Sequence, residues 1–184
     1  KEPILYPLDL EGATPENYQE LQENLLNEFG KLDGLVHNAS ILGTQMPIEQ
    51  YDIKLWYSTI QINLNAPFML TQFLIPALLK SDDARIIFLS STVGRKARAY
   101  WGAYSVSKFG IEGFAKTLSE ELEKTQISVN TVNPGKLRTE TRRTAYPAED
   151  SSTVPLPEEK SQAIVHLLSS SSPKINGEQL TISD

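Results

Sequence analysis

The chain is organised around the stretch SSTVGRKARAYWGAYSVSK, residues Ser90–Lys108, which holds a serine, a tyrosine and a lysine at informative intervals. Tyr104 and Lys108 are four residues apart, so on a helix they share one face, one turn from each other. Ser91 precedes Tyr104 by thirteen residues, a gap that fits a strand end, a loop and the start of a helix. Such a path can bring the serine hydroxyl and the phenol to one site.

These three side chains suit proton transfer at an oxygen atom. A free phenol has a pKa of about 10, and a nearby ammonium group stabilises the phenolate and lowers that pKa. Tyr104 can then act as a general acid or base closer to neutral pH. Side chains do not donate hydride, whereas a nicotinamide does. The Tyr–Lys pair alone is a weak signal, because a half-buried ring and a solvated charge often lie one turn apart.

Composition excludes several classes of protein. The 184 residues, 40% apolar and 22% charged, are typical of one globular domain, which we expect to span residues 1–184. The net charge of −6 argues against a nucleic-acid binder. The absence of cysteine excludes disulfides and thiolate catalysis, and the two histidines show no metal-ligand spacing, so no metal is expected. No apolar run is long enough to span a membrane and no signal peptide is visible, so we expect a cytoplasmic protein without membrane association.

The rest of the chain alternates strand-like and helix-like stretches. Strands are expected at residues 3–10, 35–40, 85–90, 127–132 and 179–182, and helices at residues 15–29, 49–80, around 104–122 and 157–169. In the long helical region, Pro67 predicts a break or kink near Asn63–Pro67, because proline removes a helix hydrogen bond. Residues 136–157 show no clear period and several prolines, which is typical of a mobile flap.

Alternating strands and helices predict an α/β fold with a doubly wound parallel sheet, covered by helices on both faces. Such sheets bind ligands beyond the carboxyl ends of their strands. Asp9, Asn38, Ser91 and Pro134 each stand at a predicted strand end. We therefore expect one shared cleft there.

At this point the sequence resembles the short-chain dehydrogenase/reductase family along its whole length. Ser91, Tyr104 and Lys108 match the family's catalytic serine and Y-x-x-x-K pair, and Asn63 matches the asparagine that completes the catalytic tetrad. The other matching segments are His37–Ser40 for N-N-A-G, Asn133–Gly135 with Thr139 for P-G-x-x-x-T, Asp9 for the adenine contact, and Asn176–Gly177 with Asp184 for the T-G…D segment. Within the family, the chain looks most like bacterial 3-oxoacyl-carrier-protein reductases.

The resemblance implies an enzyme with a Rossmann-like fold that transfers hydride between NADP(H) or NAD(H) and a carbonyl or alcohol substrate. Tyr104 would exchange the proton, Ser91 would orient the substrate oxygen, Lys108 would lower the phenol pKa and bind the nicotinamide ribose, and Asn63 would hold a relay water. Asp9, Asn38, Ala39, Pro134, Gly135 and Thr139, together with Tyr104 and Lys108, would contact the cofactor. The family commonly forms homodimers or homotetramers through the helices that here carry Asn63 and Tyr104.

Some features depart from the family pattern. His37 and Ser40 replace an Asn and a Gly of N-N-A-G, and we interpret His37 as a packing residue at a strand end. The Gly-rich phosphate-binding segment, expected in the first two strand–helix units, does not occur in these 184 residues. The sequence thus predicts an N-terminally incomplete domain whose third strand, within residues 1–10, lacks neighbours. A non-catalytic scaffold, or an oligomerisation core unable to bind the cofactor, therefore remains as an alternative.

Charge placement adds a hint about the substrate. Seven of the 17 basic residues fall in the two loops expected beside the cleft: Arg95, Lys96, Arg98, Lys136, Arg138, Arg142 and Arg143. In an acidic protein this indicates an anionic or carrier-bound substrate, or a cofactor phosphate. A solvated loop surface explains the pattern equally well.

Overall fold

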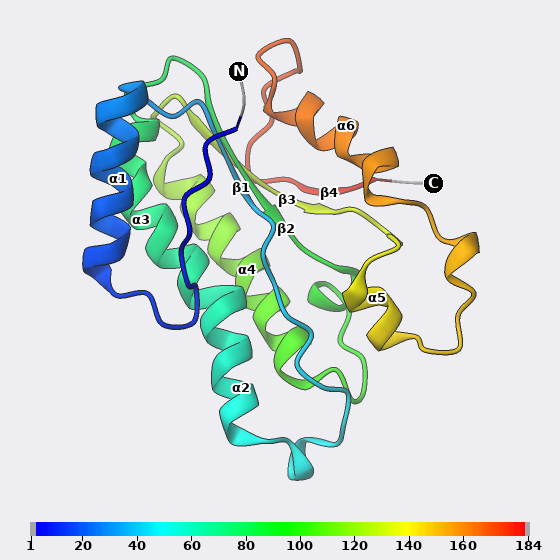
Figure 1. The fold of residues 1–184 in the computed structure, drawn as a ribbon. Coiled ribbons are helices and arrows are strands. Elements are labelled where there is room, and N and C mark those ends of the chain that lie inside the picture. The colour runs from blue at the N-terminus through cyan, green and yellow to red at the C-terminus, as the bar shows by residue number, and fades with distance from the viewer. Residues whose placement is uncertain (1–2, 183–184) are drawn as a thin grey trace.

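Four parallel strands form the centre of the computed structural model, which describes residues 3–182 (Figure 1). They pair in sequence order as β1 (Gly34–His37), β2 (Ala84–Leu89), β3 (Ile127–Asn133) and β4 (Gln179–Thr181). The register sets Phe88 of β2 beside His37 of β1 on one side and Thr131 of β3 on the other. All carboxyl ends of the strands therefore point to the same edge of the sheet.

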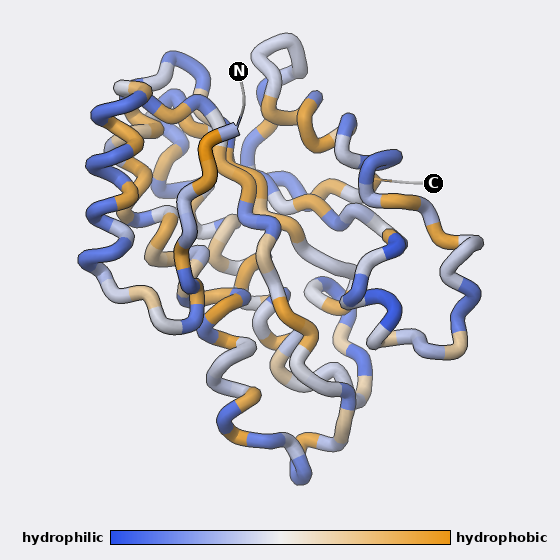
Figure 2. Tube along the Cα trace, in the orientation of Figure 1, coloured by the Kyte–Doolittle hydropathy of each residue, from blue (hydrophilic) through white to orange (hydrophobic). Residues whose placement is uncertain are grey.

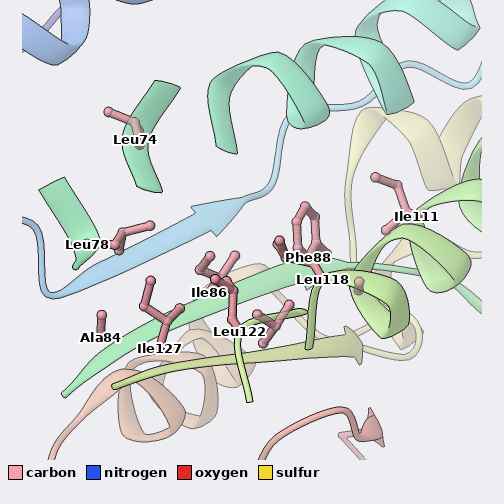
Figure 3. Packing of buried hydrophobic residues seen from close by; sticks show 11 residues of the cluster. Leu74, Leu78, Ala84, Ile86, Phe88, Ile111, Leu118, Leu122 and Ile127 are labelled. Atoms are coloured by element: carbon pink, nitrogen blue, oxygen red, sulfur yellow. The ribbon is translucent and has the colours of Figure 1, made fainter. Parts of the chain in front are cut away.

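Helices cover both faces of this sheet, as the sequence predicts (Figure 1). The helices on one face are α1 (Pro15–Phe29), α2 (Ile53–Ile60), α3 (Ala66–Leu78) and α4 (Gly102–Glu121), and α6 (Pro157–Leu168) lies on the other. Between β2, β3 and the helices α3 and α4 lies the main hydrophobic core, which includes Leu78, Ile86, Phe88, Leu118 and Ile127 (Figure 3). None of the helices among the described residues has the length and apolarity required to cross a bilayer.

Local signals fix α1 as the sequence predicts. Pro15 occupies the first turn, where a missing N–H costs nothing, and Asn17 accepts a hydrogen bond from the backbone of Thr14. Gly30 ends the helix at φ 75°, with its N–H bonded to the carbonyl of Leu26. The outer side of the helix is hydrophilic (Figure 2).

The predicted break in the long helical region is present. A π-helical turn, η2 (Gln61–Asn65), separates α2 from α3, and a short 3₁₀ turn, Ile48–Gln50, precedes α2. Pro67 lies in the first turn of α3. The break brings Asn63 into the interior, where its side chain is buried.

The predicted strand at residues 3–10 is wrong. Residues 3–9 have no regular structure, and Ile4 and Leu5 are exposed. A strand requires a ladder partner, and none of the described residues pairs with this segment. A helix forms its hydrogen bonds within itself, which is why the adjacent α1 formed as predicted.

The predicted flap, residues 136–157, contains more structure than its sequence indicates. It holds the short helix α5 (Glu140–Ala145), which is hydrophilic (Figure 2), and a 3₁₀ turn at Ser151–Thr153. Ala145 and Val154 are buried, and Arg138 donates hydrogen bonds to the carbonyls of Val154 and Ser152. The mobility of this segment stays a prediction.

Candidate active site

A cleft of about 370 Å³ opens at the carboxyl ends of β1, β2 and β3. Its lining includes Ser91, Tyr104 and Lys108, which arrive from the end of β2 and from one face of α4. The cleft lies where the strand ends predict it. The structure thus brings together the three side chains that the sequence singled out.

Ser91 and Tyr104 interact directly. Burial raises the pKa of Tyr104, and a hydrogen bond between the Ser91 and Tyr104 side chains opposes that rise. The Ser91 hydroxyl also accepts a bond from the backbone N–H of Val93, so it caps the turn after β2 as well as facing the phenol. Tyr104 packs against the Trp101 ring, with 5.9 Å between ring centroids. These contacts fix the phenol at the wall of the cleft.

Lys108 is a buried cation with few partners. Its side chain lines the cleft although only 4% of the residue is exposed, and Nζ donates a 2.8 Å hydrogen bond to the carbonyl of Leu89. Burial lowers the pKa of Lys108 to about 8, opposed by the charge of Glu112. An ammonium group has three donors, and the protein bond to Leu89 uses one of them.

The expected lowering of the Tyr104 pKa by Lys108 stays a prediction, because in this structure other influences set the direction of the shift. Burial raises the pKa of Tyr104 above its usual value of 10, and the bond with Ser91 is the opposing influence. Lys108 Nζ lies 5.6 Å from the centroid of the Tyr104 ring and bonds to a backbone carbonyl rather than to the phenol. The same burial that removes water from the phenol also disfavours charge on the lysine.

Asn63 does not line the cleft but supports its wall. Its amide accepts a bond from the N–H of Ile41 and donates to the carbonyl of Ile41, both at 2.8 Å. It also donates to the hydroxyl of Ser107 on α4 at 3.1 Å. The side chain therefore ties the loop after β1 to the helix that carries Tyr104.

The structure gathers most of the residues assigned to the cofactor. Asn38, Ala39, Pro134, Gly135 and Thr139 all line the same cleft as Tyr104 and Lys108.

Two residues from the matching segments lie elsewhere. Asp9 is not part of the lining, and its carboxylate accepts a hydrogen bond from the N–H of Glu11 in the turn before α1. Asn176 bonds to the backbone of β3 and α4. Asp184 lies outside the described residues.

Ser90 is a cleft residue that sequence reasoning missed. It is 5% exposed, lines the cleft, and its hydroxyl has no hydrogen-bond partner in the described structure. A buried hydroxyl without a partner is costly, so this atom is suited to bond a ligand. Its position beside Ser91 at a strand end was the available signal.

Two aromatic residues and His37 complete the surroundings. Trp101 lines the cleft, whereas Tyr100, which adopts φ 72°, is exposed and does not. His37 stacks on Phe88 with 4.4 Å between centroids, and its Nε2 bonds to Thr71 at 2.8 Å. Burial lowers the pKa of His37 to about 3, as suits a packing residue.

Residues 3–182 contain no group of His, Asp or Glu suited to hold a metal ion.

Comparison with known proteins gives consistent matches. Residues 2–150 match the family described as short chain dehydrogenase. The uncharacterized oxidoreductase YciK of Escherichia coli K12 is 44% identical over 150 residues, which are 82% of this chain and 59% of that protein. The 3-oxoacyl-[acyl-carrier-protein] reductase FabG of Salmonella typhimurium is 34% identical over 136 residues, 74% of this chain and 55% of that protein. The chain therefore spans less than two thirds of both relatives.

Solved structures agree with the fold. A short chain dehydrogenase from Pseudomonas syringae, 46% identical, superposes with a TM-score of 0.95 over 98% of this chain and 73% of its own. A short chain dehydrogenase from Shigella flexneri in complex with NADP, 39% identical, gives a TM-score of 0.95 over 98% of this chain and 75% of its own.

Proposed function

The chain belongs to the short-chain dehydrogenase family, and on this premise we propose that the protein transfers hydride between NADP(H) or NAD(H) and a carbonyl or alcohol substrate. The observation that carries the proposal is the convergence of Ser91, Tyr104 and Lys108 on one cleft. Related proteins crystallised with NADP and NADPH favour the phosphorylated cofactor.

The cleft suits a nicotinamide nucleotide. Its volume of about 370 Å³ falls within the range of about 300–1,000 Å³ of small-molecule sites. The unpartnered Ser90 hydroxyl and the spare donors of Lys108 are polar groups that a ligand would satisfy. Lys108 and the lining residues Asn38, Ala39, Pro134, Gly135 and Thr139 would hold the cofactor, with Asp9 assigned by resemblance to its adenine end. The bound nicotinamide supplies the hydride.

Tyr104 then exchanges the proton. Because burial raises its pKa, the phenol is protonated at neutral pH and can donate to a carbonyl oxygen as the carbon is reduced. In the same step Ser91 donates a hydrogen bond to that oxygen and orients it. The protonated phenol is the form that carbonyl reduction requires, whereas alcohol oxidation would require the phenolate.

Asn63 acts as a positioning residue in this proposal. Its amide holds the backbone of Ile41 and thereby the loop that carries Asn38 and Ala39. Both of its donors are in use, so a relay water would have to bind the remaining acceptor capacity of its oxygen. The relay role stays a prediction.

Tyr104→Phe tests the proposal. General acid catalysis contributes about 10²–10⁴-fold to rate, so we expect at least about a 100-fold loss in kcat for carbonyl reduction. NADPH affinity, measured by fluorescence titration, should be nearly unchanged because the ring remains. Tyr100→Phe is the matched control, since that exposed phenol does not line the cleft. Retained turnover in Tyr104→Phe would contradict the assigned acid.

A further inference from the structure

The basic residues near the cleft divide into two groups. Four are engaged by the protein itself: Arg95 with Glu112 and the β4 backbone, Arg138 with carbonyls of its own segment, Arg142 with Glu149, and Arg143 with Glu140. Three have no acidic ion-pair partner within the described residues: Lys96, Arg98 and Lys136. Of these seven loop cations, Lys96, Arg98 and Lys136 are therefore the ones whose charge no acidic side chain among residues 3–182 neutralises directly.

Lys96, Arg98 and Lys136 all line one cavity. This second cavity, which we call the basic cavity, has a volume of about 380 Å³ and is also bordered by Arg142. No Asp or Glu is among its lining residues, although the protein carries a net charge of −6. The hydrogen bond from Arg142 is the main cause of the lowered pKa of Glu149, and the charge of Lys136 adds to it without an ion pair between Lys136 and Glu149. The cavity is therefore locally positive in an acidic protein.

The basic cavity is continuous with the catalytic cleft. Six residues line both: Ser91, Trp101, Asn133, Gly135, Arg142 and Tyr146. Side chains of the loop after β3 line both cavities. Leu137 and Thr139 line the catalytic cleft, whereas Lys136 lines the basic cavity. A substrate whose oxygen meets Ser91 can therefore extend into the basic cavity, where Gly135 is the single lining residue that is also assigned to the cofactor.

Resting on the proposed function, we propose that the basic cavity binds an anionic group of the substrate. The substrate is then a small carbonyl compound with a carboxylate or phosphate at its far end. Lys96 and Lys136 supply ammonium groups that form no ion pair within residues 3–182, and Arg98, held by a 2.8 Å bond to the Tyr146 hydroxyl, supplies a fixed guanidinium. Val93, Ala97 and the Trp101 ring give the cavity apolar walls for the connecting carbon skeleton.

A pair of matched aldehydes tests this assignment. We would compare NADPH-dependent reduction of 4-carboxybenzaldehyde with that of its neutral methyl ester, in the unmodified protein and in the double variant Lys96→Gln/Lys136→Gln. A charge-assisted hydrogen bond corresponds to about tenfold or more in binding, so we expect kcat/KM to favour the acid by at least about tenfold. That preference should fall by about tenfold in the double variant. Equal kcat/KM for acid and ester in the unmodified protein would overturn the proposal.

The double variant Lys80→Gln/Lys124→Gln is the control for net charge. Both lysines are exposed and lie in the turns before β2 and β3, at the opposite edge of the sheet. This control should keep the preference for the acid. If Lys80→Gln/Lys124→Gln loses as much of the preference as Lys96→Gln/Lys136→Gln does, the effect is due to net charge, and the proposed anion site is wrong.

Inorganic phosphate gives a readout that does not require turnover. We expect phosphate to raise the thermal midpoint of unfolding of the unmodified protein, and the rise to be reduced in Lys96→Gln/Lys136→Gln but kept in the control. If neither aldehyde is reduced while phosphate acts in this way, the proposed reaction fails and the anion site stands. If phosphate has no effect, or acts equally in both double variants, the anion site fails. Reduction confined to a 3-oxoacyl group on a carrier protein would also overturn a small-molecule site.

Discussion

At the level of single residues, the candidate site is shaped by burial more than by paired charges. Tyr104 and Lys108 are both more than nine-tenths buried. Removal from water raises the pKa of the acid and lowers that of the base, which leaves both groups closer to their neutral forms. Near neutral pH, Lys108 is therefore close to the pH at which it loses its proton, and the Tyr104 phenol is protonated.

Lys108→Met should separate activity from stability. Below pH 8 the ammonium is charged in both folded and unfolded protein, so the folded state bears the full cost of burying it. Between pH 8 and 10.5 the folded state releases the proton first, so this cost declines as the pH rises. The pKa difference corresponds to about 3 kcal/mol, offset by about 1 kcal/mol for the lost bond to Leu89.

We therefore expect Lys108→Met to raise the free energy of unfolding by about 1–2 kcal/mol near pH 7, with a smaller gain near pH 10. Carbonyl reduction and NADPH affinity should both fall. Urea unfolding at the two pH values measures the first effect, and Lys80→Met provides a solvent-exposed comparison. If Lys108→Met is instead less stable than the parent at pH 7, the interactions of the buried ammonium outweigh the cost of burying it, and the prediction is wrong.

At the level of elements, the distance in sequence between interacting residues explains why α1 and the helix break were predicted correctly and the strand at residues 3–10 was not. Helix α1 and the break at Asn63 depend on local signals, such as Pro15, Gly30 and Pro67, and both were predicted. The strand at residues 3–10 depends on a distant ladder partner, and its prediction was wrong. Helix α5 was missed because six residues with a Thr139 cap give little periodicity.

The residues of the cleft also differ in whether the sequence alone could predict their role. Strand ends and family motifs indicated which residues would gather, and eight of them line one cleft: Asn38, Ala39, Ser91, Tyr104, Lys108, Pro134, Gly135 and Thr139. The sequence could not show which of the basic loop residues are neutralised by Glu112, Glu140 or Glu149, because that depends on side-chain pairing. It also could not show that Ser90 lacks a partner.

His37 at the end of β1 should make the protein sensitive to acid. Its pKa is lowered to about 3 by burial, so as the pH falls below 6.5 the unfolded chain binds a proton that the folded chain does not. This one group should reduce the free energy of unfolding by about 2 kcal/mol between pH 7 and pH 5. His37→Gln should remove that part of the pH dependence. His166→Gln, at the exposed histidine, should leave it intact, and equal acid sensitivity in both variants would contradict the assignment.

At the level of the whole molecule, one helical surface is apolar without a described cover. Val106, Phe109 and Gly113 of α4 share a face, because they are three and four residues apart. Val106 and Phe109 are 48% and 42% exposed, and a Cβ on Gly113 would meet open space. On the neighbouring α2, Ile53 and Tyr57 are each 69% exposed. Clustered exposed apolar residues are typical of an interaction surface.

We expect this surface to join copies of the chain in a homodimer or homotetramer. Phe109→Glu should place a charge in the interface, whose desolvation without a partner is unfavourable, and should shift the protein to monomers in size-exclusion chromatography with light scattering. Phe29→Glu, at an exposed phenylalanine of α1, should leave the mass unchanged. Gly113→Ala gives an independent check. On a free helix surface it should stabilise by about 1 kcal/mol, whereas a partner helix packed against Gly113 leaves no room for the methyl group. A stabilised Gly113→Ala variant, together with equal masses for the two glutamate variants, would show that this surface faces solvent.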